Sequence, residues 1–106
     1  MSAHLAEWRD IGAASDVRSD EPRAVVVTGK PIALFRLGAD IFALHDRCPH
    51  GQASLSDGFI DGDNVECPLH QGLVCIRTGA PKSEPITEPT ATFPTRVIAG
   101  RLEILV

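Results

Sequence analysis

Two short cysteine–histidine motifs constrain this chain more than any other feature. The first places His50 two residues after Cys48, and the second places His70 three residues after Cys67, with sixteen residues between the motifs. Thiolates and imidazoles are the side chains that proteins use to hold zinc and iron–sulfur centres. The two motifs therefore predict a metal centre, and the fold has to bring two loops together to form it.

The order of the four candidate ligands favours iron–sulfur chemistry over zinc. Structural zinc sites usually pair Cys with Cys and His with His, whereas the two residue types alternate here. When two neutral imidazoles replace two thiolates on a [2Fe–2S] cluster, the oxidised cluster is close to electroneutral and accepts an electron more easily. We therefore expect one [2Fe–2S] cluster and a carrier of single electrons. A structural zinc-binding interaction module stays open as the alternative.

Length and charge are typical of a small carrier. The chain of 106 residues predicts a single domain over 1–106, with the ligand-bearing part at about 46–76. A net charge of −4 disfavours nucleic acid and anionic membranes and favours basic partner proteins. No leader or spanning apolar run is apparent, and two of the three cysteines lie in the motifs. These features predict a cytoplasmic protein that binds no membrane.

Short β-prone runs separated by turn residues predict an all-β fold. Three consecutive runs form a meander, a hairpin between the motifs carries both ligand loops to one end, and a final hairpin closes the chain. Residues 81–94 hold four of the eight prolines and predict an irregular crossing. We expect a small antiparallel β-sandwich or barrel with a cluster-binding subdomain of two ligand loops. The expected strands are 8–11, 24–28, 32–37, 41–45, 59–60, 65–66, 73–76, 95–99 and 102–106.

Side chains outside the motifs are expected to serve the fold. Cys75 lies mid-strand and is expected to pack as a small apolar residue, while His45 at a strand end is expected to be structural. Acidic residues beside the glycine turns favour turn formation over partner steering. The aromatic residues expected in the core are Trp8, Phe35 and Phe42. The acidic group consists of Asp57, Asp61, Asp63 and Glu66, of which the first three are the expected turn residues.

Four motifs together resemble the Rieske-type ferredoxins of bacterial aromatic-ring-hydroxylating dioxygenase systems. They are C-P-H-G from Cys48, L-S-D-G from Leu55, E-C-P-L-H-Q-G from Glu66 and R-T-G from Arg77. The resemblance implies a monomeric carrier that docks transiently, taking electrons from a flavoprotein ferredoxin reductase and passing them to a terminal oxygenase. It implies no catalytic site of its own. A small Rieske subunit of an assimilatory nitrite reductase is the alternative.

The resemblance also implies a role for each ligand. Cys48 and Cys67 would hold a buried iron through sulfur, and His50 and His70 would hold the outer iron near the surface where electrons leave. All four residues are thus both the cofactor-binding and the metal-binding set.

Departures from a related branch predict the reduction potential. Rieske proteins of cytochrome bc complexes carry an extra cysteine in each motif, where this chain has Ala53 and Leu69, and hydroxyl-bearing residues where it has Gly72 and Val74. Fewer hydrogen bonds to the cluster sulfurs stabilise the reduced state less. We expect a potential near the low end of the Rieske range of roughly −150 to +300 mV.

Overall fold

Three antiparallel sheets form the protein in the computed structural model, which describes residues 5–48, 52–69 and 71–106. The first sheet has the order β1 (Trp8–Ala13), β10 (Arg101–Leu105), β9 (Thr95–Ile98). The second has the order β2 (Arg23–Val27), β3 (Lys30–Leu37), β4 (Asp40–His45), β8 (Thr92–Phe93). The third has the order β5 (Phe59–Asp61), β6 (Asn64–Glu66), β7 (Leu73–Cys75). The predicted all-β class is confirmed.

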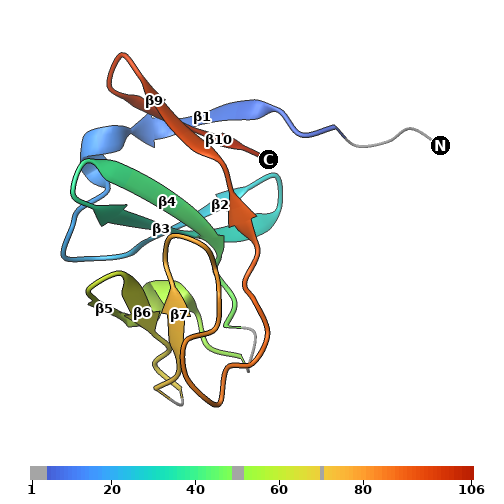
Figure 1. The fold of residues 1–106 in the computed structure, drawn as a ribbon. Helices are drawn as coiled ribbons and strands as arrows, with labels where there is room; N and C mark the ends of the chain where they lie inside the picture. Colours follow the sequence, from blue (N-terminus) through green and yellow to red (C-terminus); the bar gives the residue numbers. More distant parts are fainter. Residues whose placement is uncertain (1–4, 49–51, 70) are drawn as a thin grey trace.

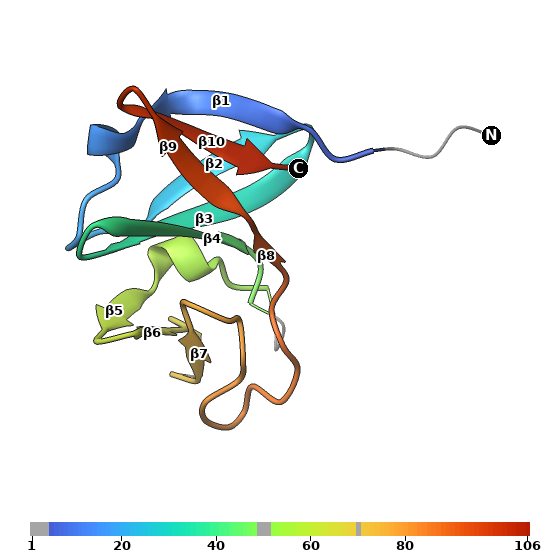
Figure 2. The ribbon, with the colours of Figure 1, turned by 45° about the horizontal axis from the view of Figure 1, so that its top comes forward.

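The second sheet lies in the middle of the molecule, between the first sheet and the small third sheet (Figures 1 and 2). Alternation along β3 explains this place, because successive side chains of a strand point to opposite faces. Ile32 and Leu34 belong to one hydrophobic cluster, shared with the first sheet, and Ala33 and Phe35 belong to a second cluster, shared with the third sheet. The predicted meander β2–β3–β4 is therefore covered on both faces.

Two short 3-10 helices, which the sequence did not predict, connect the layers. η1 (Ala14–Asp16) follows β1, and η2 (Leu55–Asp57) lies between the first ligand loop and β5. Arg36 of β3 holds the η1 segment, donating hydrogen bonds of 2.6 Å to the Val17 carbonyl and 2.7 Å to the Ala14 carbonyl. Leu55 of η2 is fully buried in the second cluster. Within the described part of the chain, no helix is long and apolar enough to cross a membrane.

The predicted irregular crossing at 81–94 is confirmed over most of its length, but Thr92 and Phe93 form β8 and pair with β4. Two residues inside the crossing hold it against the rest of the protein. Ile86 is buried in the second cluster, and the Thr90 N–H donates to the Gly79 carbonyl at 2.8 Å. The segment thus starts beside β7, where Pro81 forms a β-bridge with Val74, and returns to the second sheet (Figure 2).

Trp8 does not lie in the core, and that prediction was wrong. Its pairing partner in β10 is Leu105, which by alternation faces away from the buried Leu102 and Ile104. The ring is 36% exposed, and the guanidinium of Arg96 lies over it at 4.0 Å from the centroid. Phe35 is buried as predicted, whereas Phe42 is half-buried against the second cluster.

Candidate metal centre

The first ligand loop leaves the end of β4 and closes on itself. The Cys48 N–H donates to the Ala53 carbonyl at 2.9 Å, and Arg47 forms a β-bridge with Ser54. The Cys48 side chain is 1% exposed and belongs to the second hydrophobic cluster. The structure therefore places this sulfur inside the protein, as expected for a ligand of a buried iron. The other predicted ligand of this loop, His50, lies outside the described residues.

The second ligand loop joins β6 to β7 and is closed in the same way. The Cys67 N–H donates to the Gly72 carbonyl at 2.8 Å, and the Gln71 N–H donates to the Cys67 carbonyl at 3.0 Å. Cys67 is also 1% exposed and lies in the same cluster as Cys48. Leu69 is 52% exposed, so this loop has a buried beginning and an exposed apolar tip. His70, predicted from the second motif, is outside the described residues.

Ile86 supports the second loop from the crossing segment, a contact that no sequence pattern indicated. A Cβ atom added to Gly72 would meet the Ile86 Cγ1 and Cδ1 atoms at 2.7 and 2.8 Å. Ile86 therefore packs directly against the loop backbone, and a larger residue at position 72 would have to displace its side chain. The crossing at 81–94, which follows the Cys67 loop in the chain, therefore packs against that loop through Ile86.

The two motif cysteines, Cys48 and Cys67, suit the thiolate half of a [2Fe–2S] site. Both sulfurs are buried in one cluster, and both start loops that turn back within a few residues. Soft thiolates in an apolar, solvent-excluded pocket are the ligands that iron–sulfur clusters require. The residues present therefore fit the predicted cofactor on the cysteine side.

Cys75 is buried, as expected, but its surroundings are polar. It belongs to neither hydrophobic cluster, because it points to the face of β7 opposite Val74. Burial raises the pKa of the Cys75 thiol, but hydrogen bonds from the hydroxyl and N–H of Thr78 and the N–H of Arg77, with the charge of Lys82, hold it below its ordinary value. The side chain thus fastens the turn that follows β7.

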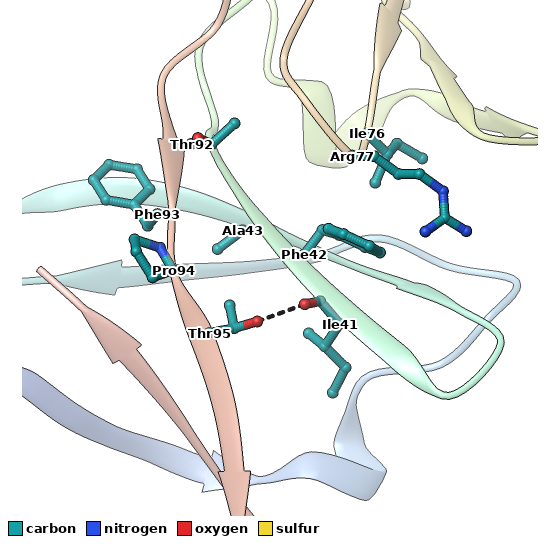
Figure 3. Close-up of a pocket in the computed structure, with 9 residues that line it drawn as sticks. All are labelled: Ile41, Phe42, Ala43, Ile76, Arg77, Thr92, Phe93, Pro94 and Thr95. Atoms are coloured by element: carbon teal, nitrogen blue, oxygen red, sulfur yellow. Dashed lines mark hydrogen bonds between the residues drawn. The ribbon is translucent and has the colours of Figure 1, made fainter.

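Arg77 in the same turn connects the third sheet to β4. Its guanidinium lies over the Phe42 ring at 5.2 Å from the centroid, and its Nε is 3.5 Å from the Asp63 carboxylate. Arg77 and Phe42 border a hollow between β4, β8 and the segment after β7, where the Thr95 hydroxyl donates to the Ile41 carbonyl at 2.6 Å (Figure 3). The nine side chains that line the hollow include no general base and no nucleophilic thiol.

The remaining polar residues singled out from the sequence lie at a strand end and in a turn. His45 ends β4 half-buried, and its Nδ1 accepts a 3.4 Å hydrogen bond from the Arg47 N–H. Asp61 and Asp63 flank Gly62, whose φ of +59° makes the turn between β5 and β6. Both residues therefore lie in the predicted turn, and a role of their carboxylates in the turn rather than in steering a partner stays a prediction.

Taken together, the central sheet, the small sheet and the two closed cysteine loops define a small β metal-binding domain. The comparisons with known proteins identify its family: residues 7–94 match the Rieske [2Fe-2S] domain, and the chain belongs to that family. Its cofactor is therefore a Rieske [2Fe–2S] cluster, and the zinc alternative is not supported.

Three known proteins illustrate the range of similarity. The ferredoxin subunit of anthranilate 1,2-dioxygenase from Burkholderia cepacia is 54% identical over 102 residues, covering 96% of this chain and 94% of its own. A ferredoxin solved in complex with the oxygenase of carbazole 1,9a-dioxygenase is 40% identical, with a TM-score of 0.87 over 92% of both chains. The small subunit of a Mycobacterium tuberculosis nitrite reductase has a TM-score of 0.85 over 97% of both chains but only 21% identity, which shows a shared fold alone.

Proposed function

We propose that this protein is the ferredoxin component of an aromatic-ring-hydroxylating dioxygenase system, passing single electrons from a flavoprotein reductase to a terminal oxygenase. The observation that carries the proposal is the 54% identity to a dioxygenase ferredoxin over nearly the whole of both chains. The solved complex of a 40% identical ferredoxin with its oxygenase supports the oxygenase as one partner. The cytoplasmic location and the transiently docking monomer expected from the sequence belong to the same proposal.

Cys48, Cys67, His50 and His70 are the proposed ligands. When bound, the cluster supplies a site that takes up and releases one electron without a proton being required. The chain itself excludes water from the cysteine side, since Cys48 and Cys67 are each 1% exposed. The two loops are held by backbone hydrogen bonds of 2.8 to 3.0 Å, which limits the rearrangement that accompanies a change of charge.

The protein is proposed to be a carrier without catalytic activity. The side chains that line the hollow in Figure 3 include no acid–base pair and no nucleophilic thiol. The nitrite reductase alternative is supported by fold similarity only, at 21% identity. Choice of aromatic substrate is assigned to the oxygenase.

Reconstitution tests the proposal. The protein should replace the native ferredoxin in the anthranilate dioxygenase system of the similar relative, supporting reductase-dependent turnover of anthranilate. Cys75→Ala should support the same turnover, whereas His70→Ala, which removes a proposed ligand, should support none. Failure of the cluster-loaded wild-type protein to take electrons from any dioxygenase reductase would count against this function.

A further inference from the structure

In the described part of the chain, Asp46 is the one charged residue that is buried, with 6% of its surface exposed. It follows β4 directly and precedes Cys48 by two residues. One carboxylate oxygen accepts a 2.7 Å hydrogen bond from the Ser56 N–H, and the other accepts one of the same length from the Ser56 hydroxyl. No ion pair among the described residues includes Asp46, and the donors that the described part of the chain gives its carboxylate are both neutral groups of Ser56.

The backbone of Asp46 is fixed as firmly as its side chain. Its N–H donates to the Pro31 carbonyl at 2.9 Å, which anchors it to the start of β3, and its carbonyl accepts a 2.6 Å bond from the Leu55 N–H. Ser54, which precedes η2, makes no side-chain cap, so the Asp46 carboxylate satisfies the Ser56 N–H of that helix instead. Asp46 therefore joins the beginning of the first ligand loop to its end.

We propose that Asp46 is the positioning residue of the first ligand loop, tying the loop to η2 so that Cys48 is held in place, and that its buried negative charge disfavours the electron added at the neighbouring site. Groups that orient a metal ligand also tune the metal, and a charge acts strongly where water is excluded. The inference rests on the proposed redox function. It names Asp46 as one residue that sets the position of Cys48 and the reduction potential of the site.

A charge-neutralising variant tests it. Asp46→Asn keeps the shape and one acceptor for the Ser56 N–H but removes the charge. As the control, Asp57→Asn neutralises an exposed carboxylate on η2, the helix that Asp46 contacts through Ser56. In the cluster-loaded proteins we expect Asp46→Asn to raise the midpoint potential, alter the electron paramagnetic resonance g-values, and lose the cluster on warming at least about tenfold faster. Asp57→Asn should stay close to wild type. Equal behaviour of the two variants would overturn the proposal.

A milder variant keeps the test decisive if Asp46→Asn cannot be loaded. Ser56→Ala removes the hydroxyl donor and leaves the N–H bond, so the cluster should be lost faster than in wild type but more slowly than in Asp46→Asn; the wild-type rate would contradict the proposal. These readouts use the isolated protein and no reductase. A loaded wild-type protein that fails in turnover would refute the proposed function while leaving the role of Asp46 intact.

Discussion

Replacing Gly79 with alanine should destabilise the protein far more than the same change at Gly100. Both glycines have a φ of +77°, so alanine is disfavoured by about 1 kcal/mol at each. At Gly100 an added Cβ meets nothing within 4 Å, but at Gly79 it would lie 2.1 Å from the Thr90 carbonyl oxygen. That contact is with backbone, which cannot turn aside as a side chain can.

Relieving this contact would move Thr90 and stretch the 2.8 Å bond from its N–H to the Gly79 carbonyl. A broken hydrogen bond in this buried place adds about 2–3 kcal/mol, giving about 3–4 kcal/mol for Gly79→Ala against about 1 kcal/mol for Gly100→Ala. At about 4 °C per kcal/mol, the melting temperature should fall by about 12–16 °C and by about 4 °C respectively. Circular dichroism of the cluster-loaded proteins at one heating rate measures both, and equal decreases would refute the reasoning.

Three further predictions concern single groups and the cluster. Cys75→Ala should retain the visible spectrum of the loaded protein, whereas Cys67→Ala should lose it; equal loss would mean that Cys75 supports the cluster. Hydrogen bonds from Arg101 and the Gly12 N–H lower the pKa of Asp10. Its stabilisation is therefore present above the ordinary aspartate pKa and is lost as pH falls through the lowered value, so Asp10→Asn should flatten the acid limb of a melting temperature–pH profile. Voltammetry should give a potential near the low end of roughly −150 to +300 mV, and a value near the top would contradict the argument from missing hydroxyls.

The central strands could be predicted because their side chains alternate between two buried faces. In β3, for example, Ile32 and Leu34 face one cluster and Ala33 and Phe35 the other, so the run from Ile32 to Phe35 is apolar. Trp8 shows the limit of the same reasoning. Hydrophobicity marks a strand residue without saying which face it occupies, and in β1 the face was decided by the register with Leu105.

The supports of the site were beyond prediction because they depend on contacts between irregular segments. Asp46 and Ser56 are ten residues apart, and nothing in their types distinguishes a buried carboxylate from a turn residue. Ile86 lies in a proline-rich stretch without periodicity, yet it rests on Gly72 in the second ligand loop. The spacing of Cys48 and Cys67, in contrast, predicted that both belong to one site, and the structure buries both in the same hydrophobic cluster, while their role as ligands stays a prediction.

The most direct test of the account is the electron paramagnetic resonance spectrum of the anaerobically purified protein before and after dithionite, with iron, sulfide and zinc analysis. A histidine-ligated [2Fe–2S] cluster predicts two irons and two sulfides per chain and, on reduction only, a signal of low average g-value. A colourless protein that contains one zinc, no sulfide and no signal after attempted cluster reloading would contradict the account.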